Sequence, residues 1–213
     1  MPYEYCIWDF NGTLLDDITT CISSVNALLD ARGLPLVKGV EHYRKIFRFP
    51  VIEYYKTLGF DFEKEPYDKL AIEWVSLYLE NVKQARLYDD AEDALRQFRE
   101  HGVKQSVLSA TEASMLKGQL DSLGISGYFE QIMGLDNIHA CSKLSLAYEW
   151  RKNHTGSKVL FIGDTDHDVD TAKALGADCI LVCRGHQSRE HLLSTGAVVV
   201  DTLDALCDIV FQR

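Results

Sequence analysis

An aspartate that can act as a nucleophile stands near the start of the chain, directly after an apolar run that includes Ile7 and Trp8. Because such a run is typical of a buried parallel strand, we expect Asp9 at the carboxyl end of that strand, where open α/β sheets bind their ligands. Gly12 allows a sharp turn there, and Thr13 offers a hydroxyl and a backbone N–H to a substrate. An aspartate so placed can attack a phosphoryl group, although a single aspartate before a glycine is more often a plain turn residue.

Three further polar side chains stand at the ends of predicted strands, namely Ser109, Lys143 and Asp164, and Asp168 follows Asp164 by one helical turn. Because the carboxyl ends of parallel strands meet at one edge of a sheet, we expect these side chains to lie close to Asp9. Asp164, with Asp168 behind it, can bind Mg²⁺, which prefers carboxylates, waters and substrate phosphate. Ser109 and Lys143 can hold phosphate oxygens and offset their charge. Each has an ordinary explanation by itself, but their order along the chain favours one shared site.

The predicted elements that must position these residues indicate an α/β fold. Apolar segments alternate with helical patterns in the later part of the chain, at 103–109, 131–134, 158–163, 179–183 and 198–200. This alternation is typical of a parallel sheet with helical crossovers. Residues 16–85 show helical periodicity and no convincing strand. We therefore predict a sheet-containing core formed by residues 1–15 and 86–213, interrupted by an all-helical subdomain at 16–85.

The composition and net charge restrict the kinds of partner and the cellular compartment that we expect for this protein. The 213 residues carry a formal net charge of −10, which argues against a nucleic-acid surface and leaves a small anionic substrate to be held by a local basic group or a metal. No apolar stretch approaches the roughly 20 residues of a membrane span, and no secretory signal is visible. Six cysteines lie scattered without a CxxC pair. We expect a cytoplasmic protein that is a monomer or a homodimer.

Four segments carry a resemblance to a known family: Asp9-Phe10-Asn11-Gly12-Thr13-Leu14, Ser109, Lys143 and Gly163-Asp164-Thr165-Asp166-His167-Asp168. In their types and order they resemble the four motifs of the haloacid dehalogenase superfamily, nearest its phosphoglycolate-phosphatase-like branch. The resemblance covers essentially the full chain. It implies a Rossmann-like core with a helical cap, and hydrolysis of a small phosphorylated substrate through an aspartyl phosphate at Asp9. It also implies Mg²⁺ held by Asp9, the backbone carbonyl of Asn11 and Asp164, and we add Asp168 to that set.

Asn11 departs from the family pattern at the position that matters most for turnover. Phosphatases of this family have an aspartate there, which protonates the leaving group and then activates water. An amide does neither near neutral pH, and losing a general acid–base typically costs about 10²–10⁴-fold in rate. We therefore expect phosphate and Mg²⁺ binding to survive better than turnover.

Four interpretations follow from this departure. The first is a phosphatase that is slow or draws its acid–base from elsewhere, for example from His42 or His167, and the second is a phosphate-binding or phosphotransfer protein. A dehalogenase is disfavoured by Asp164 and Asp168. Phosphonate cleavage would need a cap lysine that forms a Schiff base, and neither Lys45 nor Lys56 stands in the pattern of that branch.

A basic and aromatic cluster in the predicted cap offers a means of choosing the substrate. Its members are His42, Tyr43, Arg44, Lys45 and Arg48. Arg48 can clamp a substrate anion through bidentate contacts, whereas the ordinary alternative, slightly favoured, is a solvated helix face.

Overall fold

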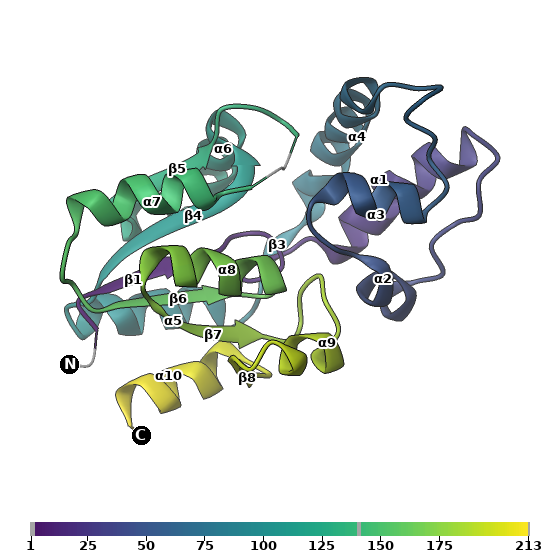
Figure 1. Ribbon diagram of the computed structural model, residues 1–213. Coiled ribbons are helices and arrows are strands. Elements are labelled where there is room, and N and C mark those ends of the chain that lie inside the picture. The colour runs from purple at the N-terminus through teal and green to yellow at the C-terminus, as the bar shows by residue number, and fades with distance from the viewer. Residues whose placement is uncertain (1–2, 140–141, 213) are drawn as a thin grey trace.

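The computed structural model describes residues 3–139 and 142–212, which contain a six-stranded parallel sheet with helices on both faces (Figure 1). The strand order is β5-β4-β1-β6-β7-β8. The strands are β1 (Tyr5–Trp8), β4 (Lys104–Glu112), β5 (Gln131–Leu135), β6 (Val159–Gly163), β7 (Asp178–Val182) and β8 (Val198–Val200). The α/β fold that the sequence predicts is confirmed.

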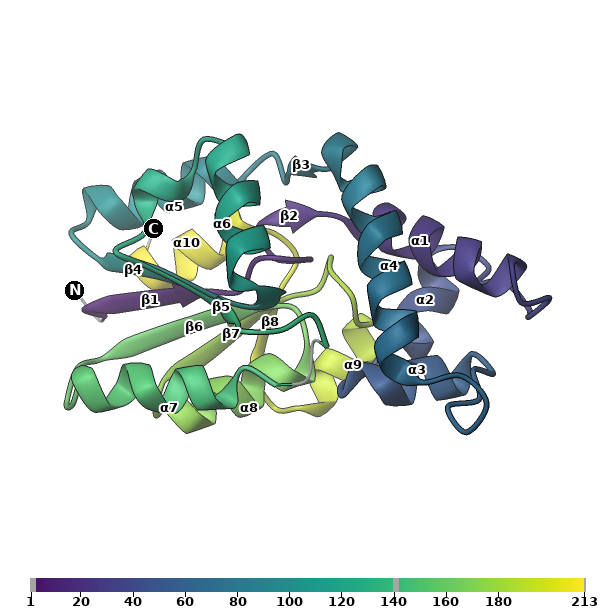
Figure 2. The same ribbon diagram turned by 90° about the horizontal axis from the view of Figure 1, so that it is seen from above.

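Strand β1 lies inside the sheet, and its side chains alternate between the two faces. Cys6 and Trp8 pack into the apolar core on one face, and Ile7 packs against Leu108 and Phe161 on the other. This follows from the two-residue period of a strand, and it explains why the run is apolar throughout. Helices α5, α6 and α10 cover the first face, and α7 and α8 cover the second (Figure 2). The helices of this part are α5 (Ala91–Glu100), α6 (Ala113–Ser122), α7 (Leu144–Asn153), α8 (Asp166–Leu175), α9 (Arg189–Ser194) and α10 (Leu203–Phe211), with a short 3₁₀ helix η2 (Ser126–Tyr128).

The segment between β1 and α5 is helical and has an apolar core of its own. Its elements are α1 (Ile18–Asp30), α2 (Val40–Ile46), α3 (Val51–Thr57), α4 (Tyr67–Asn81) and the 3₁₀ helix η1 (Val82–Gln84). Its core includes Val25, Leu29 and Leu70. Two short strands, β2 (Leu15–Asp16) and β3 (Arg86–Leu87), pair antiparallel where the chain enters and leaves this segment. The division at residues 15/16 and 85/86 stays a prediction, and this ribbon lies at both of its boundaries.

Local hydrogen bonds move some element ends away from the sequence prediction. Strand β4 continues past Ser109 to Glu112. Helix α8 begins at Asp166 rather than at about Asp168, because Thr165 and Asp168 form a capping box at its start. The sequence also did not predict the β2–β3 ribbon or helix α9.

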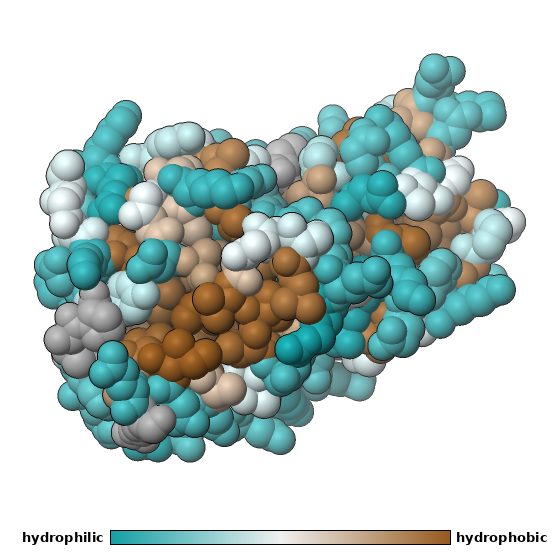
Figure 3. All heavy atoms as spheres, turned by 60° about the horizontal axis from the view of Figure 1, so that its bottom comes forward, coloured by the Kyte–Doolittle hydropathy of each residue, from teal (hydrophilic) through white to brown (hydrophobic). Residues whose placement is uncertain are grey.

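On the face drawn in Figure 3, polar side chains surround an extended apolar patch. On the C-terminal elements Leu193, Val198 and Ile209 are each more than half exposed. Among residues 3–139 and 142–212, no helix is both long enough and apolar enough to cross a membrane.

Candidate active site

Neighbouring strands bring three of the predicted site residues to one edge of the sheet. Asp9 directly follows β1, and its backbone N–H donates to the carbonyl of Ile162 in β6 at 2.8 Å. Asp164 follows β6, and Ser109 lies near the end of β4. Because β4 and β6 flank β1, all three side chains line the same cavity.

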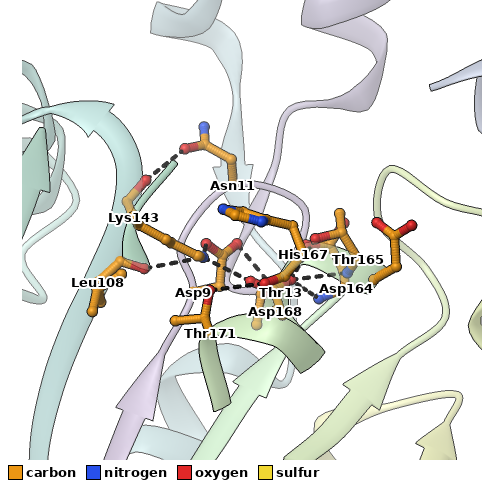
Figure 4. A network of polar contacts seen from close by, with 12 residues as sticks. Asp9, Asn11, Thr13, Leu108, Lys143, Asp164, Thr165, His167, Asp168 and Thr171 are labelled. Atoms are coloured by element: carbon orange, nitrogen blue, oxygen red, sulfur yellow. Dashed lines mark hydrogen bonds and ion pairs between the residues drawn. The ribbon is translucent and has the colours of Figure 1, made fainter. Parts of the chain in front are cut away.

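Lys143 joins this group from the N-cap of α7, and its side chain is buried. Its ammonium forms ion pairs with Asp9 Oδ1 and, at 2.7 Å, with Asp168 Oδ1 (Figure 4). It also donates to the carbonyl of Leu108 at 3.3 Å. Burial alone lowers the pKa of Lys143, but the carboxylates of Asp168 and Asp9 outweigh burial and hold that pKa above its usual range. Lys143 is therefore a fixed positive charge beside the candidate nucleophile.

Asp168 holds this lysine and the start of α8 at the same time. Its Oδ2 accepts hydrogen bonds from the backbone of Asp164 and Thr165 and from the Thr165 hydroxyl, at 2.8–3.0 Å. Burial disfavours its ionised form, but the ion pair with Lys143 outweighs burial and lowers the pKa of Asp168. Both oxygens of Asp168 thus have partners, so it positions its neighbours whether or not it also contacts a metal.

Thr13 orients the two remaining carboxylates. Its hydroxyl donates to Asp164 Oδ1 at 3.1 Å and lies 3.5 Å from Asp9 Oδ2. The side chain is fully buried and does not line the cavity, so the predicted substrate contact by Thr13 remains a prediction.

The donor set of this cluster fits a hard divalent cation. Carboxylate oxygens of Asp9, Asp164 and Asp168 lie within 4.8 Å of one another, and the ammonium of Lys143 pairs with two of the three, Asp9 and Asp168. Burial raises the pKa of Asp9 and of Asp164 to about 8 in each case, with neighbouring carboxylates adding to the rise. A Cβ at Gly12 would lie 2.5 Å from Asp164 Oδ2 and a Cβ at Gly185 only 2.0 Å, so only glycines fit around this carboxylate. Mg²⁺ would supply the missing positive charge.

Comparison with known proteins agrees with this geometry. The family model described as haloacid dehalogenase-like hydrolase matches residues 6–182. The chain belongs to this family. It is 24% identical over 210 residues to phosphoglycolate phosphatase of Pseudomonas putida, covering 94% of this chain and 77% of that protein. It is 26% identical over 227 residues to phosphoglycolate phosphatase of Nitrosococcus oceani, covering 98% and 97% of the two chains.

A solved structure shows the same fold over the whole length. A haloacid dehalogenase-like hydrolase from Streptococcus pneumoniae superposes with a TM-score of 0.84 at 16% identity, covering 100% of this chain and 99% of that one. The family model and the phosphoglycolate phosphatase relatives confirm the predicted family and enzyme class, a hydrolase of the phosphatase type.

Asn11 of this hydrolase is held by hydrogen bonds from two sides. Its Nδ2 donates to Asp17 Oδ2 and to the Tyr78 hydroxyl, both at 2.8 Å. Its Oδ1 accepts from the Thr111 hydroxyl at 2.8 Å and from the Ser109 hydroxyl at 3.4 Å. An amide suits this position because it can donate toward a carboxylate on one side and accept from hydroxyls on the other. An aspartate here would instead face the carboxylate of Asp17.

Among the lining residues that sequence reasoning missed, Asp17, Tyr78, Thr111 and His186 are polar and lie nearest the predicted site residues in the fold. Thr111 and His186 had a usable signal, because each lies within or just beyond the end of a strand, as the predicted residues do. The His186 backbone N–H donates to Asp164 Oδ2 at 2.6 Å. Asp17 and Tyr78 had no such signal, since they approach from the N-cap of α1 and the last turn of α4.

Asp17 also lies beside Cys21 and His186, and the three form a second buried group of metal-ligand types. Asp17 Oδ2 already accepts from Asn11, from the Tyr78 hydroxyl at 2.8 Å and from the Cys21 thiol at 3.5 Å. The Tyr43 hydroxyl holds His186 Nδ1 at 2.8 Å. The hydrogen bonds of this group account for its geometry without a metal.

The basic residues predicted to clamp the substrate lie away from the cavity. Arg48 is exposed, and its Nε donates to the carbonyl of Ile46 at 3.3 Å. Arg44 instead donates to the carbonyls of Arg184 and Gly185, and thereby joins the cap to the loop after β7. Of the predicted site residues, the structure therefore brings together Asp9, Asn11, Ser109, Lys143, Asp164 and Asp168, and it leaves Arg48 outside.

The alternative acid–base and Schiff-base candidates also lie elsewhere. His42 Nδ1 accepts from the backbone of Lys38 at 3.0 Å, and the His167 ring stacks on Phe49 with centroids 4.7 Å apart. Neither histidine lines the cavity, and neither Lys45 nor Lys56 does.

Proposed function

We propose that this hydrolase is a Mg²⁺-dependent phosphatase that cleaves a phosphate monoester of a small organic molecule through an aspartyl phosphate at Asp9. The observation that carries the proposal is the contact of Asp9 with Lys143 at the edge of the sheet, next to Asp164. Asp9, the backbone carbonyl of Asn11 and Asp164 would hold Mg²⁺, with Asp168 behind them. The phosphoglycolate phosphatases among the relatives support the same reaction type.

The first step transfers the phosphoryl group to the protein. A carboxylate oxygen of Asp9 bonds to phosphorus while the bond from phosphorus to the ester oxygen breaks, leaving the electron pair on that oxygen. Lys143 holds Asp9 in place and offsets the charge of the phosphoryl oxygens. When bound, Mg²⁺ adds positive charge at the same oxygens. The leaving oxygen takes its proton from water, because the amide of Asn11 does not release a proton near neutral pH.

The second step returns Asp9 to its free form. Water attacks phosphorus, the bond to Asp9 breaks, and inorganic phosphate leaves while the proton lost by the water passes to solvent or phosphate. Since Asn11 cannot take this proton, we expect the aspartyl phosphate to last longer than in a phosphatase with an aspartate at this position.

Asn11 also favours a second candidate function, a phosphate-binding or phosphotransfer protein. Hydrogen bonds to Asp17, Tyr78, Thr111 and Ser109 hold its amide in place. This position is therefore occupied by a group that cannot act as a general acid toward the leaving group. A phosphorylated Asp9 that hydrolyses slowly could pass its phosphoryl group to another acceptor.

Acid-quenched kinetics with an aryl phosphate and Mg²⁺ separates the two candidates. A phosphatase gives a steady rate of phosphate release well above that of the Asp9→Asn variant. The second candidate gives about one equivalent of alcohol product per protein molecule and then almost no further phosphate. If the wild type and Asp9→Asn behave alike in both phases, the phosphatase and phosphotransfer functions are both excluded, and only phosphate binding, measured by calorimetry with Mg²⁺, is left of the second candidate.

The remaining expectations from sequence stay predictions. These are a cytoplasmic location, a monomeric or homodimeric state and the absence of nucleic-acid partners. Sedimentation of the purified chain tests the oligomeric state directly.

A further inference from the structure

The cavity over Asp9 has two unlike halves. Its floor is polar and comes from the sheet edge, with Asp9, Asn11, Lys143 and Asp164. Its wall is aromatic and comes mostly from the cap. The wall includes Phe47, Phe49, Tyr54, Tyr67, Trp74 and Tyr78.

The aromatic wall reaches the floor directly. The rings of Trp74 and Tyr78 stack on α4 with centroids 4.8 Å apart and planes within 17°. The Tyr78 hydroxyl in turn accepts a hydrogen bond from Asn11 Nδ2. An organic group attached to a phosphate held over Asp9 would therefore meet this pair of rings.

Among the described residues, the wall offers no lysine or arginine to a second anionic group on the substrate, and the Nε2 of its His186 lies 3.7 Å from Asp17 Oδ1. In the described part of the chain, Lys143 is the only lysine or arginine that lines the cavity, and Asp9 and Asp168 already pair with it. Two carboxylates outside the proposed metal cluster, Asp17 and Glu112, line the cavity as well. A carboxylate on the substrate would thus lose its water without gaining a lysine or arginine as a partner, which is costly in an apolar cavity.

One neutral polar contact is available in the wall. The hydroxyl of Tyr54 is buried and has no hydrogen-bond partner among the described residues. It can donate a hydrogen bond to an uncharged polar atom of the substrate or accept one from it.

From this division of charge we propose that the substrate is a phosphate monoester whose organic group is aromatic and carries no negative charge. This inference rests on the phosphatase function proposed above and narrows it. It separates this hydrolase from its phosphoglycolate phosphatase relatives, since phosphoglycolate carries a carboxylate next to its phosphate. The cap rings would take up the organic group, and the floor would take up the phosphate.

Benzyl phosphate, 4-carboxybenzyl phosphate, methyl phosphate and phosphoglycolate form a suitable substrate series, because all four release alcohols. We expect kcat/KM for benzyl phosphate to exceed that for phosphoglycolate by about 10- to 100-fold, as burial of one aromatic ring implies. The added carboxylate of 4-carboxybenzyl phosphate should lower kcat/KM by at least about 10-fold. A preference for phosphoglycolate over benzyl phosphate would overturn the inference while leaving the phosphatase function intact.

Binding of phosphonates tests the inference even if turnover fails. In calorimetry with Mg²⁺, we expect benzylphosphonate to bind at least about 10-fold more tightly than phosphonoacetate. Equal or reversed affinities overturn the proposed substrate class, whatever the kinetics show. If benzylphosphonate binds more tightly but no phosphate is released from any substrate, the proposed aromatic class is supported and the phosphatase function is contradicted.

Substitution of Trp74 tests the role of the wall. Trp74→Ala should lower kcat/KM for benzyl phosphate by about 10-fold and leave that for methyl phosphate within about 2-fold, while Trp74→Phe should keep most of the preference. Leu79→Ala, at an exposed position of the same helix, is the matched control and should change neither value. The ratio of the two substrates within one variant does not depend on the folded fraction, so equal losses for both substrates count against the proposal.

Discussion

The two halves of the cavity differ in how much of their geometry is fixed by hydrogen bonds and ion pairs. On the sheet side, the buried ammonium of Lys143 forms ion pairs with the buried carboxylates of Asp9 and Asp168, and the Thr13 hydroxyl donates to Asp164. On the cap side, the wall consists mainly of rings that contact one another through van der Waals surfaces. In the function proposed above, the sheet edge would perform the phosphoryl chemistry, while the cap would select the organic group by shape and apolar character.

Loss of the nucleophile should give the largest effect. Asp9→Asn keeps the size of the side chain but removes the attacking oxygen, so we expect phosphate release to fall by at least about 10³-fold. Acid-quenched assays with an aryl phosphate measure this loss, and Asp16→Asn at an exposed carboxylate nearby is the control. Residual activity close to that of the wild type would show that Asp9 is not the nucleophile.

Exchanging the side-chain types of Asn11 and Asp17, which meet between the sheet side and the cap side of the cavity, should raise turnover. Asn11→Asp alone should gain little, because its carboxylate would face Asp17 Oδ2, which now lies 2.8 Å from Asn11 Nδ2. The double variant Asn11→Asp with Asp17→Asn exchanges the two groups and should raise turnover by about 10²-fold. The measurement is steady-state phosphate release for both single variants and the double variant. An equal gain in the single Asn11→Asp variant would show that Asp17 does not control this position.

Removal of the buried cation should lower stability on the sheet side. Lys143→Met leaves Asp9 and Asp168 without their partner, and breaking a buried ion pair costs about 3–5 kcal/mol. Urea unfolding without Mg²⁺ measures this loss, and saturating Mg²⁺ should restore part of it if the metal binds there. Lys104→Met removes an exposed lysine and should cost less than about 1 kcal/mol. Similar losses for the two variants would contradict a structural role for Lys143.

The buried carboxylates predict a pH dependence of stability. The pKa of Asp9 and that of Asp164 are raised to about 8, above the value of about 4 of an unfolded aspartate. The unfolded chain therefore releases these protons first, so the free energy of unfolding without Mg²⁺ should fall as pH rises between about 5 and 8, by on the order of 1 kcal/mol per pH unit. Urea titrations at several pH values test this, and Asp164→Asn should flatten the slope. Stability that rises over this range in the metal-free protein would contradict the raised values.

The smallest effect is expected at Arg48. Its side chain is exposed and lies outside the cavity, so Arg48→Ala should change KM by less than about 2-fold for both an aryl phosphate and phosphoglycolate. Steady-state kinetics on the two substrates provide the measurement. A selective rise of KM for phosphoglycolate would support the hypothesis that Arg48 clamps a substrate anion. It would also weaken the contrast between a charged floor and an apolar wall.

The resemblance of four motifs indicated the family, and the apolar pattern of the sequence by itself determined the α/β fold and the residues at the sheet edge. It could do so because strand ends are local signals: Asp9, Ser109 and Asp164 each close an apolar segment, and parallel strands bring such ends to one edge. Lys143 follows the same rule less directly, through the start of the helix after β5.

Only the tertiary structure decided what surrounds those residues. The polarity of Asn11 is explained by Asp17 and Tyr78, which reach it from α1 and α4 and have no common sequence signal. Helical periodicity marked the aromatic residues of the cap as apolar, but it did not tell which of them face the cap core and which face the active site. For the same reason the sequence left open whether Arg48 clamps the substrate or lies on a solvated helix face, whereas the orientation of the helices places rings and not Arg48 along the cavity. Packing between elements that are distant along the chain sets these contacts, and no local pattern records it.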